Sequence, residues 1–327
     1  MSVRYISQRI KQIHQLLIMT GWLTVSIIIA IYWTLQLPGY HLSIFLELFV
    51  SFVFFVLLFY RIEGLLKDKV RSEEKERKNS FTRRESSSFQ GFCRELNNQD
   101  EKGFCDYWGK ILNLSVNKHH IRYLENRIRY IEHSCIGRLA SNSQDVILHL
   151  LVAEALEKEE KLDYMEIGAL YGVNAIVVYD LASTLFKDCH ITMIDPLDGY
   201  YGDNKRDPCT GLPITEKVIL KNMELHKISQ KSYTLIKKYS TDRAAFSEAK
   251  KKTYNYLFID GDHSYEGIKE DFEKYSPLVR SNGYLLIDDY GHPDWPDVTK
   301  FVDEVIKTSN AFECLGHSWK TIVFRKY

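Results

Sequence analysis

The sequence has no excess of charge of either sign and lacks the spacings of several common cofactor and metal motifs. Its 43 basic and 43 acidic residues balance, so bulk electrostatics do not suggest a nucleic-acid partner. The six cysteines are scattered without a CxxC pair, which favours reduced thiols over a disulfide framework or a zinc finger. Neither GxGxxG nor the GK[ST] ending of a P-loop occurs. A nicotinamide or P-loop site is therefore not indicated.

Two long apolar runs stand out near the start of the chain. Residues 16–37 carry no charge and residues 41–60 carry one, Glu47, and each run is long enough for the roughly 20 helical residues that cross a bilayer. Pro38-Gly39 breaks the chain between them. The pattern predicts a transmembrane hairpin over residues 1–61, with a pair of buried helices in a soluble domain as the alternative.

Basic residues flank this hairpin on both outer sides, and the turn between the runs has neither Lys nor Arg. We therefore expect a membrane protein with both termini and the following domains on the cytoplasmic side. Residues 62–88 are rich in charge and serine and are predicted to be a linker, and residues 89–160 have the spacing of a helical lead-in.

Strand and helix patterns alternate through residues 161–327. Such alternation predicts an α/β fold with a Rossmann-like, doubly wound sheet and right-handed crossovers. We expect strands at residues 164–167, 190–194, 233–237, 256–259, 284–287, 311–315 and 319–324.

A glycine-containing turn, EIGALYG, follows the first of these strands. Gly168 and Gly172 allow the backbone to come close to a ligand, and Glu166 offers a carboxylate to a cationic or hydroxylated part of it. Asp195 ends the second strand, where Rossmann-like sheets hold a ribose diol. The alternative is that Asp195 caps the turn that it forms with Pro196.

Carboxylates also follow two later strands. Asp260 ends the strand at 256–259, and Asp288 and Asp289 end the strand at 284–287. Ligands of an open parallel sheet lie beyond the carboxyl ends of its strands, so both acidic groups should face one crevice.

The motifs EIGALYG, MIDP, LFIDGDHSYEGIKEDFEKYSPLVRSNGYLLIDDY and WPDVTKFVDEV resemble those of class I S-adenosylmethionine-dependent methyltransferases. The similarity is to the group of macrocin-type sugar O-methyltransferases and cephalosporin-hydroxylase-like proteins, and it covers residues 162–327. It implies that Glu166 holds the methionine part of S-adenosylmethionine and Asp195 the ribose. It also implies that Ser240, after the third strand, contacts adenine or the adenosine hydroxyls.

The same resemblance implies a site for Mg²⁺ or another divalent cation, held by Asp260, Asp288 and Asp289. Hard cations prefer oxygen ligands, and three converging carboxylates would repel one another without a cation. The alternative is that these acids only cap loops. The resemblance makes His263 the candidate general base. It implies that Asp260 is also a catalytic residue and that it contacts the cofactor. A histidine that merely anchors the DGDHSYEG loop is the other interpretation.

The sequence as a whole predicts a membrane-anchored, cytoplasm-facing O-methyltransferase that acts on a hydroxyl of a small-molecule or lipid-linked saccharide. A homo-oligomer is a further expectation. Two alternatives are a hydroxylase-like metal-dependent enzyme on the same fold, and a non-catalytic scaffold that keeps the methyltransferase-like domain.

Overall fold

The computed structural model describes residues 96–156, 160–199 and 206–327. The chain divides into two units, Met1–Ser88 and Phe89–Tyr327, and all described residues belong to the second. The predicted hairpin and linker lie outside the described residues. No described helix is both long enough and apolar enough to cross a bilayer, so the described part of the chain does not bear out the predicted membrane localisation.

Seven strands form one sheet in the order β3-β2-β1-β4-β5-β7-β6. Strands β1 to β5 are parallel, and β7 runs antiparallel to both β5 and β6. This arrangement confirms the predicted Rossmann-like sheet. The strands are β1 (Lys161–Ile167), β2 (Asp188–Ile194), β3 (Tyr233–Ile236), β4 (Tyr254–Ile259), β5 (Val279–Ile287), β6 (Phe312–Ser318) and β7 (Thr321–Lys326).

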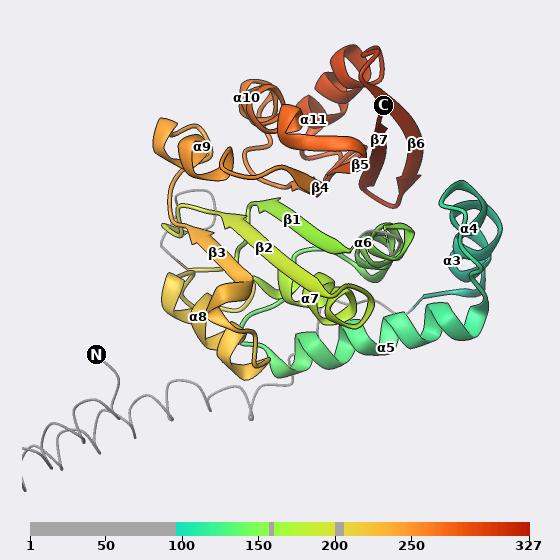
Figure 1. Ribbon diagram of the computed structural model, residues 1–327, viewed down its shortest axis with the longest axis horizontal. Helices are drawn as coiled ribbons and strands as arrows, with labels where there is room; N and C mark the ends of the chain where they lie inside the picture. The colour runs from blue at the N-terminus through green and yellow to red at the C-terminus, as the bar shows by residue number, and fades with distance from the viewer. Residues whose placement is uncertain (1–95, 157–159, 200–205) are drawn as a thin grey trace, which may run out of the picture. The chain divides into compact units, whose positions relative to one another are not determined.

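Helices cover both faces of this sheet (Figure 1), with α6, α7 and α8 on one face and α9, α10 and α11 on the other. The helices are α3 (Asn98–Gly103), α4 (Gly109–Ile111), α5 (Lys118–Ser134), α6 (Ser143–Ala155), α7 (Val173–Leu185), α8 (Glu216–Leu225), α9 (Arg243–Ala249), α10 (Tyr265–Tyr275) and α11 (Pro296–Phe301). Single turns of other helix types lie at Phe104–Trp108, Gln230–Ser232, Ser276–Leu278 and Val302–Ile306.

The helices of the lead-in differ in how much of their surface is buried. Helix α5 is amphipathic: its apolar residues face the protein, and Asn117 caps its first turn by accepting a hydrogen bond from the His120 amide. Helix α6 is buried on all sides from Ser143 to Ala153 and packs against α5 and α7. A helix with no solvent-exposed face belongs inside a fold, so α6 is part of the core.

A buried ion pair ties the segment between α5 and α6 to the loop after β2. The Arg138 guanidinium donates from Nε to Asp207 Oδ2 at 2.9 Å and from Nη2 to Oδ1 at 3.0 Å, and both side chains are almost fully buried. Asp207 also accepts hydrogen bonds from the Thr210 hydroxyl and amide, so this carboxylate organises its own loop.

We expect Arg138→Met to lower the free energy of unfolding by about 3–5 kcal/mol, because it leaves the Asp207 carboxylate buried without its counter-charge. Urea denaturation of the full chain measures the change. Lys187→Met is the matched control, since Lys187 pairs with Glu160 on the exposed surface and should be close to neutral. Equal stability of the two variants would show that Asp207 does not depend on Arg138.

Candidate active site

A cavity opens at the carboxyl ends of β1 and β4. Part of its wall is the turn between β1 and α7, and another part is the segment between α5 and α6. The lining residues are Arg138, Leu139, Ala140, Ser141, Glu166, Gly168, Ala169, Leu170, Val173, Asn174, Phe258 and Asp260. The lead-in therefore contributes directly to the site. The sequence did not predict this contribution, because residues 138–141 match no motif and reach the cavity only through the packing of α5 and α6.

Glu166 is the buried carboxylate of this cavity. Its Oε2 accepts hydrogen bonds from the Tyr164 hydroxyl at 2.5 Å and from Asn174 Nδ2 at 3.1 Å. Burial raises the pKa of Glu166 to about 8, although both hydrogen bonds act to lower it. A carboxylate in this position would be stabilised by a cation that enters the cavity, and the ammonium group of an amino acid is such a cation.

The turn after β1 requires glycine because its backbone lies against the backbone at the end of β4. Gly168 has a φ of +87°, and a Cβ at this residue would lie 1.8 Å from the Asp260 carbonyl oxygen. Gly172, with a φ of +69°, immediately precedes α7. We expected these glycines to admit a ligand, and the structure shows that Gly168 admits the end of β4. The contact fixes the spacing between Glu166 and Asp260.

Asp195 holds the glycine turn in place from the end of β2. Its Oδ2 accepts hydrogen bonds from the amides of Ala169 at 2.8 Å and Leu170 at 2.9 Å, and its Oδ1 accepts one from the amide of Leu197 at 2.7 Å. The last bond is the turn cap that the sequence offered as the alternative role. Asp195 lies at the end of β2, next to β1, the strand that contains Glu166. Its contact with a ribose stays a prediction.

Ser240 lies in the loop that follows β3. Its carbonyl oxygen accepts a hydrogen bond from the Tyr275 hydroxyl at 2.7 Å. The neighbouring Tyr239 donates its hydroxyl to Asp198, so the loops after β2 and β3 are in contact. Glu166 near the end of β1, Asp195 after β2 and Ser240 after β3 therefore lie at the carboxyl ends of three neighbouring strands.

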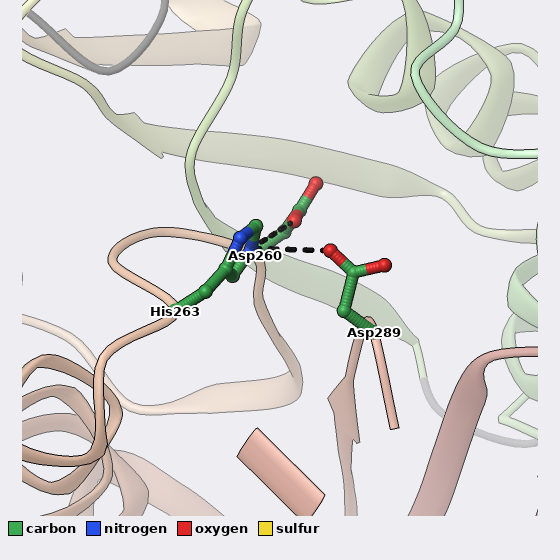
Figure 2. Close-up of side chains that lie close together, drawn as sticks. All are labelled: Asp260, His263 and Asp289. Carbon is green, nitrogen blue, oxygen red and sulfur yellow. Dashed lines mark hydrogen bonds and ion pairs between the residues drawn. The ribbon is translucent and has the colours of Figure 1, made fainter. Parts of the chain in front are cut away.

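Three side chains with metal-binding atoms meet beyond β4 and β5, as Figure 2 shows. Asp260 ends β4, His263 precedes α10, and Asp289 follows β5. His263 Nε2 lies 3.2 Å from Asp260 Oδ1 and 3.4 Å from Asp289 Oδ2. One possible ligand atom from each residue lies within 4.8 Å of the other two.

Burial dominates the electrostatics of this cluster. It raises the pKa of Asp260, and the negative charges of Asp288 and Asp289 raise it further. Burial followed by the charge of Asp288 raises the pKa of Asp289 to about 6. Burial lowers the pKa of His263, which keeps its imidazole neutral at neutral pH. The Trp295 ring, whose centroid is 4.9 Å from that of His263, forms part of the surroundings.

Asp288, a metal ligand according to the family resemblance, has hydrogen-bond partners of its own. Its Oδ1 accepts a hydrogen bond from the Thr321 hydroxyl at 2.7 Å, and its Oδ2 accepts one from the Ser141 hydroxyl at 3.1 Å. Successive residues at a strand end point to opposite sides, and Asp289 has a left-handed backbone with a φ of +58°. The structure thus brings Asp260 and Asp289 together with His263, and it joins Asp288 to β7 and the lead-in.

The donor atoms of Asp260, His263 and Asp289 fit a divalent cation. A positive ion would relieve the cost of burying two carboxylates close together. Carboxylates with additional waters suit Mg²⁺, whereas an imidazole as the third ligand suits Mn²⁺, Fe²⁺ or Zn²⁺.

Residues 165–290 match the model of a family described as methyltransferase domain. An uncharacterized protein of Acanthamoeba polyphaga mimivirus is 28% identical over 199 residues, covering 60% of this chain and 81% of that protein. The O-methyltransferase NovP is 20% identical with a TM-score of 0.42, covering 65% of this chain and 84% of its own. The calicheamicin methyltransferase CalS11 is 13% identical with a TM-score of 0.44, covering 73% of this chain and 98% of its own.

The solved structures are only distantly similar, so the assignment depends on the domain match and the sheet. The matched segment runs from within β1 to just beyond β5 and includes Glu166, Asp195, Asp260, His263 and Asp289. It therefore contains the carboxyl-end residues that form the site. The domain match and the Rossmann-like sheet together identify residues 165–290 as a methyltransferase domain of the S-adenosylmethionine-dependent kind.

Proposed function

We propose that this protein transfers the methyl group of S-adenosylmethionine to a hydroxyl group of a sugar-like acceptor, with the help of a divalent cation. One observation carries the proposal. The buried Glu166 carboxylate and the group of Asp260, His263 and Asp289 lie at the carboxyl ends of the neighbouring strands β1, β4 and β5. This arrangement supports a site for a cationic cofactor next to a site for a divalent cation.

The cofactor would lie along the strand ends. Glu166 would bind its ammonium group, Asp195 would accept hydrogen bonds from its ribose hydroxyls, and Ser240 would contact its adenine. When bound, S-adenosylmethionine supplies an electrophilic methyl group. The contact between Gly168 and Asp260 holds the cofactor side of the site at a fixed distance from the acceptor side.

His263 is the proposed general base. Its neutral imidazole can accept the proton of the acceptor hydroxyl, and its position between Asp260 and Asp289 stabilises the imidazolium that forms. A divalent cation held by the two carboxylates would polarise the acceptor oxygen as a Lewis acid. Two neighbouring hydroxyls suit such a cation, because it can accept both as ligands in place of water. A sugar with a vicinal diol is therefore the acceptor that we favour.

We expect the full chain to bind S-adenosylmethionine in calorimetry and to methylate members of a panel of sugars and nucleotide sugars when Mg²⁺ or Mn²⁺ is present. Mass spectrometry of the product distinguishes the addition of a methyl group from the addition of an oxygen atom by a hydroxylase-like enzyme. His263→Ala should bind the cofactor but lose about 10²–10⁴-fold in turnover. A folded protein that binds no S-adenosylmethionine, with or without metal, would rule out the proposal and favour a scaffold.

A further inference from the structure

Helix α10 holds the loop after β3 with three side chains from one face. Residues three and four apart on a helix are neighbours, so Asp271, Lys274 and Tyr275 point to the same side. The Tyr275 hydroxyl donates to the Ser240 carbonyl oxygen at 2.7 Å, and Lys274 Nζ donates to the Thr241 carbonyl oxygen at 3.0 Å. Asp271 is the third member of this face, and it lies near the Ser240 hydroxyl.

Asp271 is only 1% exposed, and neither of its carboxylate oxygens accepts a hydrogen bond of strict geometry from the described residues. Burial raises its pKa to about 7, while the hydroxyl of Ser240 lowers the pKa. A Cβ on Gly261 would lie 3.0 Å from Asp271 Oδ2. The carboxylate therefore lies between the loops that follow β3 and β4, where a buried acceptor requires a donor.

We propose that Asp271 is a positioning residue whose carboxylate accepts a hydrogen bond from the Ser240 hydroxyl. Ser240 then presents only acceptor lone pairs to the cofactor. The group recognised is then the exocyclic amine of adenine. This inference rests on the proposed function, because it assigns the base-reading contact within the same cofactor site.

The argument depends on the single proton of a hydroxyl. Serine can donate one hydrogen bond and accept others, so an unconstrained Ser240 could pair with either an amine or a carbonyl group. Once the Ser240 hydroxyl donates its hydrogen bond to Asp271, only a hydrogen-bond donor on the ligand can pair with the Ser240 oxygen. Adenine carries an amine at its 6-position, whereas hypoxanthine carries a carbonyl oxygen there. The carboxylate would thus convert a permissive hydroxyl into a selective one.

The position of Ser240 agrees with this role. Glu166, Asp195 and Ser240 lie at the carboxyl ends of β1, β2 and β3, which are consecutive neighbours in the sheet. A cofactor whose amino-acid end lies at Glu166 and whose ribose lies at Asp195 extends its base toward Ser240. The hydrogen bond between Tyr239 and Asp198 keeps the last two loops together.

The test compares S-adenosylhomocysteine with S-inosylhomocysteine, which differ in the 6-position of the base. Both ligands are titrated calorimetrically into the full chain. We expect the unmodified protein to prefer S-adenosylhomocysteine by about tenfold to a hundredfold, because the wrong base leaves a buried polar group unpaired. Asp271→Leu and Ser240→Ala should each reduce the preference to within about threefold, and the double variant should add nothing further.

Glu273→Gln is the matched control, because Glu273 is an exposed acid on the same helix. It should keep the full preference. If Asp271 has a purely structural role, its substitution would weaken the binding of both ligands equally and leave the ratio of their affinities unchanged, which would overturn the inference. An unmodified protein that binds both ligands with equal affinity would also overturn it. If Asp271→Leu does not fold, Asp271→Ala and Ser240→Ala provide the same ratio test, because neither variant can form this hydrogen bond. Failure of the unmodified protein to bind either ligand would instead refute the proposed function.

Discussion

Glu166→Gln is expected to weaken S-adenosylmethionine binding by about 10²–10³-fold and, at high pH, to make the unliganded protein more stable. The loss of affinity follows because the amide keeps the shape of the side chain but not the charge that would pair with the cofactor ammonium. The gain in stability follows because the variant has no buried carboxylate to ionise. The side-chain amide oxygen of the variant replaces the acceptor that Tyr164 and Asn174 already use.

The sign of the pH effect comes from the pKa of Glu166, which is about 8 in the folded protein against an ordinary value of 4.5. Between these two pH values the folded state keeps a proton that the unfolded state has released. The contribution of Glu166 to stability therefore falls as pH rises through this window, and its cost is fully present above about pH 8. Glu166→Gln should remove this slope.

Urea denaturation at pH 5 and pH 9, with calorimetric titration of the cofactor, measures both effects. Glu313→Gln serves as the control, because Glu313 is exposed on β6, the strand at the edge of the sheet farthest from β3. Unchanged cofactor affinity in Glu166→Gln would contradict the assigned role of this carboxylate. A variant that is less stable than the unmodified protein at pH 9 would contradict the buried-charge explanation.

Asp260→Asn and Asp289→Asn are expected to weaken Mn²⁺ binding by at least about tenfold and to abolish metal-stimulated methyl transfer, because each removes one charged ligand oxygen. Asp288→Asn should change Mn²⁺ affinity by less than about threefold. The oxygens of Asp288 accept hydrogen bonds from Thr321 and Ser141 rather than facing the cluster. Asp288→Asn should instead lower the stability of the folded protein, since the amide offers only one acceptor oxygen to the hydroxyls of Thr321 and Ser141.

Mn²⁺ titration of the full chain, followed by calorimetry or electron paramagnetic resonance, compares the three variants directly. Thermal unfolding of each variant separates a loss of metal binding from a loss of folded protein. If Asp288→Asn weakens Mn²⁺ binding as much as Asp289→Asn, the ligand set predicted from the sequence is correct. The geometry around Asp289 and His263 would then rearrange when the metal binds.

The sheet could be predicted from the sequence because its signals are local. Strand β4 is a short apolar run that ends at Asp260, and β5 is one that ends at Asp288, so both the strands and the acids at their ends are visible in the sequence. Boundaries were less accurate where polar residues belong to a strand. The predicted strand at 284–287 is the buried half of β5, which begins at Val279.

The site was less predictable because side-chain direction and long-range packing leave no local pattern. Asp288 and Asp289 are equivalent in the sequence, and only the left-handed backbone of Asp289 separates their directions. Arg138 and Ser141 reach the cavity through the packing of two helices far from the motifs. Asp271 occupies an ordinary position of an amphipathic helix, and its burial depends on the loop that packs over it.

Residues 138–141 form one wall of the cavity and precede the matched methyltransferase domain, which begins at residue 165. Changes there can reshape the pocket while the sheet and its carboxylates stay intact. A substitution in this connection between two helices would therefore alter the shape of the pocket without changing a residue of the matched domain.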